Sequence, residues 1–275
     1  MPVRSVGHGW SVGNRRTTAI RKPASVNNTG VTEPAGPGGA AIVAGLTPAD
    51  YERIVPFEAL LDRIVAERQE DWRQFRRQLH RQPELSGAEI LTTQIICRRL
   101  ESLGLQPRIT SRGVGCFADL WTGANSPDLP LIAIRADIDG LPLQDRKQTE
   151  YSSTCPGKAH ACGHDVHTTI ALAVAEMIVQ LQQRLSESAM PVARLRLLFQ
   201  PAEEWGTVNG VPSGGPAMVA DGAMDNPKVE AVFGQHINAQ APGGSINYRK
   251  GGAMASGDSF TITVKGSGGH GAQPW

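Results

Sequence analysis

Three continuous apolar runs, each followed directly by polar residues, constrain the fold of this chain more than any other feature. The runs cover 131–134, 195–199 and 229–233. Unbroken apolar runs of this length are typical of strands that are covered on both faces of a sheet. Helical patterns over 165–185 and 216–223 separate them. The alternation predicts an α/β fold with a mostly parallel central sheet flanked by helices.

Other elements are expected before these runs. The spacing of apolar residues predicts helices over 57–79 and 88–103, the first followed by a proline and the second by a glycine. Apolar residues alternate over 114–120, which predicts an antiparallel strand exposed on one face. Residues 1–50 are rich in Gly, Pro, Ser, Thr, Asn and Ala, so we expect a disordered tail there.

The composition excludes several function classes. The formal net charge of the 275 residues is +1, so no charge excess points to nucleic acid or to an acidic membrane surface. No apolar run approaches the roughly 18 residues of a membrane span. Arg15 and Arg16 resemble a twin-arginine export signal, but the residues after them lack its apolar core. We therefore expect a cytoplasmic protein without nucleic-acid or membrane partners.

Chemically active side chains follow the three apolar runs. Asp137 and Asp139 follow the first run, Glu203 and Glu204 the second, and His236 the third. Because ligands bind outside the carboxyl ends of the strands in open α/β sheets, we expect these residues near one crevice.

A Cys- and His-rich segment adds to this set. Residues 160–167 read HACGHDVH and include Cys162 and His164 at the start of a predicted helix. Thiolate, imidazole and carboxylate together are the ligands of zinc or a neighbouring transition metal. Because these ligands are spread over several strand ends and have a second carboxylate beside them, the pattern favours a catalytic site over a structural one.

These residues also allow two other interpretations. Glu203 and Glu204 could be a solvated loop pair, although an apolar strand directly precedes them. Cys162 and His164 could form a thiol-protease dyad, but nothing else in the sequence supplies the remaining parts of that chemistry.

Four neighbouring residues are expected to have structural roles. His160 and His167 are interpreted as hydrogen-bonded neighbours of the site, and His80 as structural. Asp165 precedes a long apolar helix and is expected to be its N-cap.

Six segments, taken together and in order, resemble the successive signatures of the N-acyl-amino-acid amidohydrolases. This family includes the hippurate hydrolases and the plant indole-acetyl-amino-acid hydrolases, within the zinc carboxypeptidase-like metallopeptidases. The matching segments are LHRQPELSGAE (79–89), RADIDGLPLQD (135–145), HACGHDVHT (160–168), FQPAEE (199–204), FGQHI (233–237) and MASGDSFTITVKGSGGHGAQP (254–274).

The resemblance implies metal-dependent cleavage of the amide bond of a small N-acyl amino acid. Cys162, His164, Glu204 and His236 match the family's metal ligands, with zinc or manganese as the metal and two ions in the complete fold. An alternative is a dipeptidase or carboxypeptidase of the same superfamily.

The resemblance also implies three catalytic roles. Glu203 matches the general base, which takes a proton from a water molecule that the metal activates. Asp137 matches an acid that orients an imidazole ligand. His270 matches a lid histidine that helps to stabilise the oxyanion.

We expect three regions. The composition predicts the tail over 1–50, and the resemblance implies an incomplete catalytic domain over 56–255 and the start of a lid or dimerisation domain over 256–275. Alternating Phe260, Ile262 and Val264 predict the first strand of the lid, followed by the start of a helix. We expect a C-terminal truncation, because the complete fold adds the rest of the lid, a late histidine ligand and a route to a homodimer or higher oligomer. An inactive metal-binding remnant is therefore a further alternative.

Overall fold

The structure is a computed structural model that describes residues 18–20, 48–122, 129–185, 193–205, 207–208, 211–212, 214–244, 246–248 and 262–273. Residues 45–239 form one compact unit, and residues 1–44 with 240–275 form a second. The predicted disordered tail lies outside the described residues, except for 18–20 and 48–50.

The first unit contains the predicted helices and strands. Its helices are α1 (Pro48–Arg81), α2 (Ile90–Ser102), α3 (His164–Arg184) and α4 (Gly215–Ala220). Its main sheet consists of β2 (Arg108–Ile109), β3 (Cys116–Thr122), β4 (Leu131–Asp137), β5 (Ala193–Gln200) and β8 (Val229–Gly234). A short antiparallel pair, β6 (Thr207–Val208) and β7 (Val211–Pro212), follows β5. None of the helices that the structure describes is long and apolar enough to cross a membrane.

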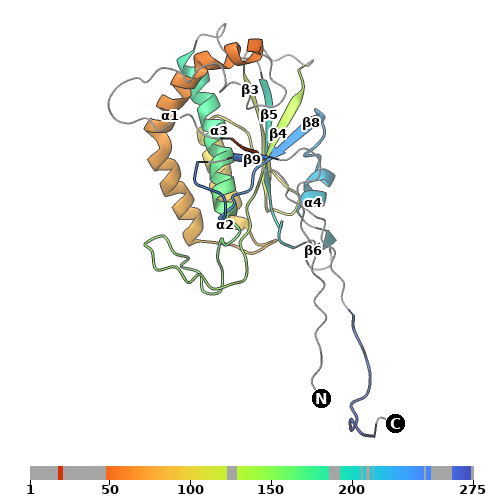
Figure 1. Ribbon diagram of the computed structural model, residues 1–275. Helices are drawn as coiled ribbons and strands as arrows, with labels where there is room; N and C mark the ends of the chain where they lie inside the picture. Colours follow the sequence, from red (N-terminus) through yellow and green to blue (C-terminus); the bar gives the residue numbers. More distant parts are fainter. Residues whose placement is uncertain are drawn as a thin grey trace. The chain divides into compact units, whose positions relative to one another are not determined.

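The order of strands in the five-stranded sheet is β2-β3-β5-β4-β8. β4 pairs in parallel with both β5 and β8, whereas β3 pairs antiparallel with β5 and β2. The sheet therefore has the predicted parallel core and an antiparallel side. Because the connection through α3 leads to one neighbour of β4 and the connection through α4 leads to the other, the chain changes direction at the carboxyl end of β4 (Figure 1). Such switch points are where open α/β sheets bind ligands.

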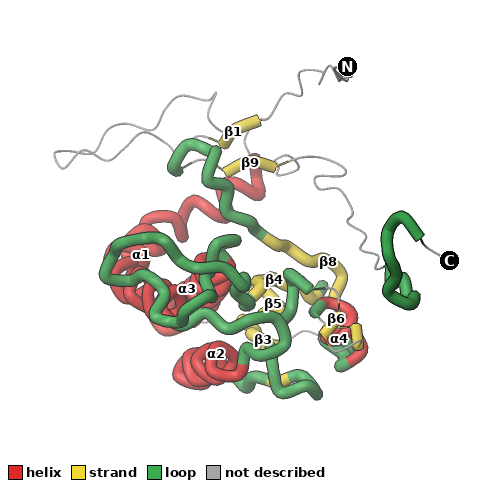
Figure 2. Tube along the Cα trace, turned by 90° about the horizontal axis from the view of Figure 1, so that it is seen from below, coloured by secondary structure: helices red, strands yellow, loops and turns green. Residues whose placement is uncertain are grey.

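Helices cover both faces of this sheet. α1, α2 and α3 lie on one side and α4 on the other, as Figures 1 and 2 show. On the first side, Leu100 of α2 and Leu172 of α3 pack in one buried cluster with Phe199 of β5. On the second side, Met218 of α4 packs with Leu198 of β5 in another. The predicted α/β fold with flanking helices is thus confirmed.

Two predictions of strand exposure are wrong. β3 was expected to be exposed on one face, but Phe117 is as buried as its neighbours Cys116 and Ala118, because both helical layers extend over this strand. β8 was expected to be covered on both faces, yet Val232 is 47% exposed and Phe233 is 64% exposed. β8 has only β4 as a partner in the sheet, so its far side lacks a neighbouring strand among the described residues.

The second unit contains one strand pair, in which β1 (Thr18–Ile20) is antiparallel to β9 (Ile246–Tyr248). The predicted lid strand is wrong for its described residues: Ile262 and Val264 are exposed and irregular. Phe260, the third residue of that prediction, lies outside the described residues. A tight turn at His270, bridged to Gln273, stands where the start of a helix was expected. A strand needs a hydrogen-bonded partner, and the described part of the chain provides none for 262–264.

Candidate metal centre

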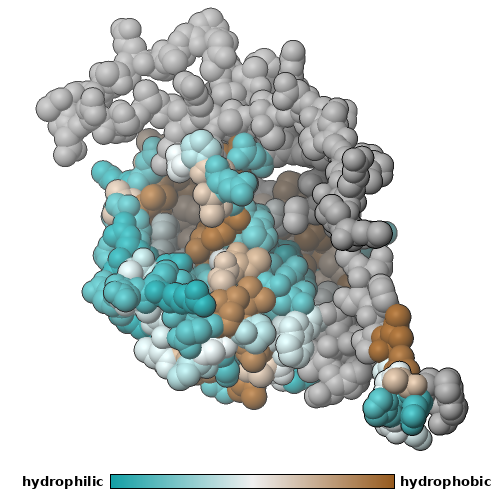
Figure 3. Space-filling model, turned by 60° about the horizontal axis from the view of Figure 1, so that its bottom comes forward, coloured by the Kyte–Doolittle hydropathy of each residue, from teal (hydrophilic) through white to brown (hydrophobic). Residues whose placement is uncertain are grey.

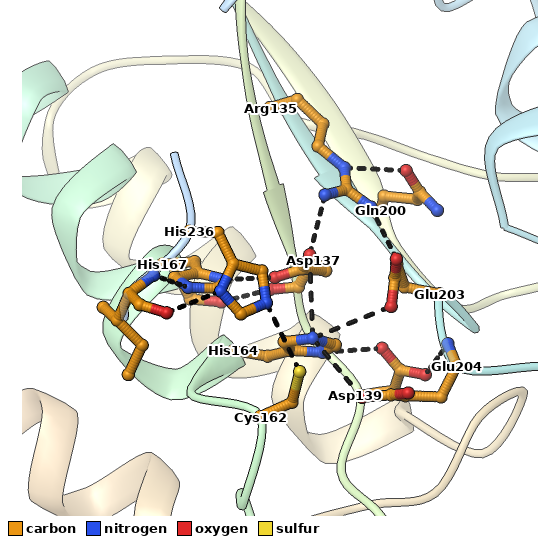
Figure 4. A network of polar contacts seen from close by, with 12 residues as sticks. Arg135, Asp137, Asp139, Cys162, His164, His167, Gln200, Glu203, Glu204 and His236 are labelled. Atoms are coloured by element: carbon orange, nitrogen blue, oxygen red, sulfur yellow. Dashed lines mark hydrogen bonds and ion pairs between the residues drawn. The ribbon is translucent and has the colours of Figure 1, made fainter. Parts of the chain in front are cut away.

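The side chains predicted to share a crevice surround His164, the first residue of α3 (Figure 4). Asp137 ends β4, and Glu203 and Glu204 follow β5. His236 follows β8. The polar residues at the carboxyl ends of the three parallel strands therefore lie at one edge of the sheet. In the view of Figure 3, apolar and hydrophilic side chains are mixed on the surface of the described residues.

A tight turn at Gly163 places Cys162 and His164 on the same site. Gly163 has a φ of +92°, a left-handed conformation that side chains disfavour. A Cβ at this position would lie 2.2 Å from Cδ1 of Ile237, so a larger residue would also displace the Ile237 side chain. The spacing C-G-H is therefore a local backbone requirement of the site.

His164 presents one ring nitrogen to the site. Its Nδ1 lies 3.0 Å from Oδ1 of Asp139 and must donate, because a carboxylate only accepts. Its Nε2 therefore carries a lone pair in the neutral ring, and it is buried without a hydrogen-bond partner among the described residues. Nε2 lies 3.6 Å from Oε1 of Glu204, which is also buried and without such a partner.

His236 is arranged in the same way. Its Nδ1 donates to the carbonyl oxygen of Ile237 at 2.7 Å, and its Nε2 lies 3.4 Å from Sγ of Cys162. Ligand atoms of Cys162, His164 and His236 all lie within 4.8 Å of one another. Both histidines thus use Nδ1 for a hydrogen bond and leave Nε2 for a ligand.

This donor set fits a divalent transition metal. Zinc binds nitrogen and oxygen at about 2.0–2.2 Å and sulfur at about 2.3 Å, so two ligands on one tetrahedral ion are about 3.5 Å apart. The separations of 3.6 Å (His164 to Glu204) and 3.4 Å (His236 to Cys162) agree with that value. An ion between these atoms would also satisfy Nε2 of His164 and Oε1 of Glu204, which have no hydrogen-bond partner.

The protonation of the cluster without an ion follows from its burial and charges. Burial, reinforced by Glu204, raises the pKa of the Cys162 thiol to about 12. Burial opposes charge on His164, but the hydrogen bond to Asp139 and the charge of Asp137 raise its pKa. Metal ligation requires loss of these protons. A thiol with so high a pKa is also a poor nucleophile, which argues against the thiol-protease dyad.

The two adjacent glutamates have different surroundings. The Glu203 side chain is 37% exposed and that of Glu204 is 21% exposed. Oε1 of Glu203 lies 3.8 Å from Nη2 of Arg135, and burial together with Asp137 raises the pKa of Glu203. A carboxylate with a raised pKa and access to solvent is suited to accept a proton near neutral pH.

Asp137 and His167 connect the strands behind the site. Oδ1 of Asp137 accepts from Nδ1 of His167 at 2.6 Å, and its Oδ2 accepts from Arg135 at 2.7 Å. Nε2 of His167 accepts from the backbone N–H of Ile237 at 2.9 Å. Both ring nitrogens of His167 are therefore in use without a metal, as expected for a hydrogen-bonded neighbour of the site.

Two of the neighbouring residues differ from the sequence prediction. His160 is not hydrogen-bonded: both ring nitrogens are buried without a partner among the described residues, and burial lowers its pKa to about 4. Asp165 is not the N-cap of α3, which is Gly163. The Asp165 carboxylate instead lies 2.7 Å from Nδ1 of His80 and 2.7 Å from Nε of Arg76. A charged partner and a buried imidazole compete successfully with the helix end for this carboxylate.

His270 belongs to the second unit, so its predicted catalytic role stays a prediction. It is exposed, and its Nδ1 accepts from the backbone N–H of Ala272 at 3.2 Å.

Sequence reasoning placed Asp139 near the crevice but gave it no role. Asp139 accepts from Nδ1 of His164, from Oγ of Ser86 at 2.6 Å and from the backbone N–H of Glu204 at 3.0 Å. The spacing of two residues between Asp137 and Asp139 could have indicated this role, because residues two apart in an extended segment point to the same side. Asp139 accepts the hydrogen bond from Nδ1 of His164 and so orients this ring, whereas Asp137 accepts from Nδ1 of His167.

Known proteins are similar to this chain in sequence and in fold. Over 199 residues the chain is 38% identical to N-acetyl-L-cysteine deacetylase of Bacillus subtilis, covering 72% of this chain and 44% of that protein. Over 208 residues it is 38% identical to thermostable carboxypeptidase 2 of Saccharolobus solfataricus, covering 74% and 49%. A crystal structure of the YXEP protein of Bacillus subtilis, titled a dinuclear metal binding peptidase from the M20 family, is 33% identical. It matches with a TM-score of 0.52 over 67% of this chain and 45% of that one.

The chain spans about half the length of the curated relatives it matches. Residues 133–274, just over half of the chain, match the family described as Peptidase family M20/M25/M40. This segment contains the ends of β4, β5 and β8 and the start of α3, which together carry the candidate metal ligands. The chain therefore belongs to Peptidase family M20/M25/M40.

Proposed function

We propose that this chain carries the metal centre of a hydrolase that cleaves the amide bond of N-acyl amino acids. Cys162, His164, Glu204 and His236 hold a divalent ion, zinc or manganese. The observation that carries this proposal is the shared arrangement of the two histidines, each donating from Nδ1 and presenting Nε2 to another candidate ligand. Oxygens that fix the Nδ1–H in this way are typical of metal-binding histidines.

Glu203 and Arg135 have separate roles in the proposed reaction: Glu203 transfers a proton and Arg135 positions Glu203. The ion, when bound, supplies positive charge that polarises an amide carbonyl and makes a water molecule more acidic. Glu203 would accept a proton from that water as the water oxygen bonds to the carbonyl carbon, and would deliver this proton to the amide nitrogen as the C–N bond breaks. Arg135 lies against both Glu203 and Asp137 and keeps the base facing the ligands.

The substrate class rests on the relatives. A deacetylase of an N-acetyl amino acid supports the proposal, and a carboxypeptidase of equal identity supports a peptide substrate instead. Both reactions break an amide bond next to an amino acid, so the same centre serves either. A panel of N-acetyl and N-benzoyl amino acids against N-blocked dipeptides would separate them. We expect the free amino acid to be released faster from the N-acyl amino acids. Faster release from the N-blocked dipeptides would favour carboxypeptidase activity instead.

The division of roles between the glutamates tests the mechanism. In a version of the chain extended to the length of its relatives, Glu203→Gln should retain the metal and lower kcat by at least ~100-fold, because a general base contributes ~10²–10⁴. Glu204→Gln should lose metal first, as measured by elemental analysis after dialysis. An equal loss of metal in both variants would show that the roles are assigned wrongly, and activity that survives removal of all metal would refute the metal mechanism.

A further inference from the structure

The turn that carries Glu203 and Glu204 has an unfavourable backbone conformation. Ala202 has a φ of +47°, in the left-handed region where Cβ crowds the following carbonyl. The turn is also tightly enclosed. A Cβ on Gly115 would lie 2.4 Å from Cδ of Pro201, and a Cβ on Gly214 would lie 2.7 Å from the carbonyl oxygen of Ala202. Such a conformation persists only where the surroundings hold it in place.

A buried carboxyl from another element contacts this residue directly. Oε1 of Glu89 accepts a hydrogen bond from the backbone N–H of Ala202 at 2.7 Å, and Glu89 is fully buried. At the other end of the turn, Asp139 accepts from the backbone N–H of Glu204 at 3.0 Å. Two carboxylates thus hold the turn at the residues on either side of Glu203.

The position of Glu89 is not explained by its own helix. Glu89 stands at the N-cap of α2 but makes no capping hydrogen bond with its side chain. Glu84 does this instead, accepting from the backbone N–H groups of Leu91 and Thr92 at 3.1 and 2.7 Å. The Glu89 side chain is therefore free to point away from α2 toward the turn.

Burial of the Glu89 carboxyl lowers the stability of the folded chain, because the group loses its contact with water. Desolvation, reinforced by the nearby charge of Asp139, raises the pKa of Glu89 to about 7. Its Oε2 is buried without a hydrogen-bond partner among the described residues. A buried carboxyl whose Oε2 lacks a hydrogen-bond partner calls for a specific role, because a neutral apolar side chain would pack there at lower cost.

We infer that Glu89 is a positioning residue of the metal centre: its hydrogen bond to Ala202 fixes the left-handed turn from which Glu203 and Glu204 point in different directions. The effect on the ligands rests on the proposed function, whereas the effect on the turn does not. Glu89 touches neither the ligand atoms nor the site of proton transfer.

Two variants of the 275-residue chain separate this role from packing. Glu89→Gln keeps an oxygen that can accept from Ala202, and Glu89→Met removes the acceptor at similar volume. In the metal-free chain, amide hydrogen exchange at Ala202 should be ~10-fold or more faster in Glu89→Met and close to wild type in Glu89→Gln. In a Co²⁺ titration, Glu89→Met should bind ~10–100-fold more weakly with an altered visible spectrum, and Glu89→Gln should restore both.

Glu176→Met is the matched control. Glu176 is also buried, but it accepts from Arg68 at 2.6 Å and Trp72 at 3.0 Å of α1 and from Arg99 of α2 at 2.9 Å, and none of these residues is a candidate ligand. It should lose stability without changing the Co²⁺ spectrum or the exchange at Ala202. If Glu89→Met does not fold, Glu89→Asp replaces it, because the shorter side chain should also fail to reach Ala202.

The outcomes are distinguishable. Wild-type exchange at Ala202 in Glu89→Met, or a Co²⁺ affinity changed no more than in Glu176→Met, would overturn the positioning role. If the wild-type chain binds no Co²⁺, the proposed metal centre fails, and the exchange at Ala202 still decides whether Glu89 holds the turn.

Discussion

Two parts of the proposed metal centre, here called the buried half and the edge half, are built differently; Cys162, Glu203 and Glu204 belong to neither. The buried half (Asp137, Asp139, His164 and His167) is at most 1% exposed, and its imidazoles donate to its carboxylates. The edge half (residues 233–237, at the end of β8) is largely exposed. It is attached to the buried half by the bond from the backbone N–H of Ile237 to His167 and by a bond of 3.3 Å from Gln235 to the carbonyl oxygen of His167.

Because of this difference, substitutions in the two halves should affect folding stability and metal binding differently. Removing a partner in the buried half leaves polar groups unsatisfied in the interior, which costs folding stability as well as ligand geometry. A change in the edge half exposes the affected groups to water, so it should weaken metal binding with little effect on folding. Variants in the two halves should therefore fall into two classes.

The largest effect is expected for Asp139→Asn. Asp139 accepts from His164, Ser86 and Glu204 at once, and an amide cannot accept with its nitrogen. We expect the free energy of unfolding to fall by about 3–5 kcal/mol, as when one partner of a buried charged network is removed. Urea denaturation of the metal-free chain measures it. Asp221→Asn, at an acid near the surface that accepts from Ser111, is the control; a loss no larger than in this control would contradict the preorganised buried half.

A smaller effect, with a defined pH dependence, is expected for Glu89→Gln. Because burial raises the pKa of Glu89 from 4.5 to about 7, the folded chain holds this proton more tightly than the unfolded chain. The contribution of the protonated carboxyl to stability is complete below about pH 4.5 and is lost as the pH rises to about 7. Glutamine does not titrate, so the Glu89→Gln variant does not lose this stability. The free energy of unfolding of the variant minus that of the wild type should increase by about 2 kcal/mol between about pH 5 and pH 8. A difference independent of pH would show that Glu89 ionises normally.

His236→Ala tests the edge half. Loss of this ligand should weaken Co²⁺ or Zn²⁺ binding by more than the ~10–100-fold that loss of a hydrogen-bond partner behind a ligand typically costs, although the three other ligands remain. The free energy of unfolding without metal should change by less than ~0.5 kcal/mol, because the ring is exposed. Titration calorimetry and denaturation measure the two quantities on the same sample. A large loss of metal-free stability would place His236 with the buried half.

The smallest effect is expected at Phe233→Thr. Phe233 is 64% exposed on the free side of β8, and threonine is also favoured in strands. We expect a change in unfolding free energy within ~0.5 kcal/mol. A thermal unfolding scan of the metal-free chain would show it, and destabilisation of several kcal/mol would mean that another part of the protein covers this strand.

The same comparison shows what the sequence could predict. The apolar runs correctly predicted β4, β5 and β8, and the polar residues after them meet at one edge of the sheet. Exposure was predicted incorrectly for β3 and β8, because the pattern of a strand does not reveal which strands and helices will lie beside it. Asp165 could not be assigned either, since its partners His80 and Arg76 are distant in sequence. Contacts between distant segments decided every feature that the sequence missed.

Zinc K-edge X-ray absorption of the zinc-loaded chain tests the central claim most directly, because it reports the ligand atoms without requiring activity. We predict one sulfur neighbour at about 2.3 Å, from Cys162, with nitrogen and oxygen neighbours at about 2.0–2.2 Å. The sulfur neighbour should disappear in Cys162→Ser while nitrogen neighbours remain. A bound zinc without sulfur in the wild-type chain, or with the same sulfur signal in Cys162→Ser, would contradict the assignment of the metal centre to Cys162, His164, Glu204 and His236.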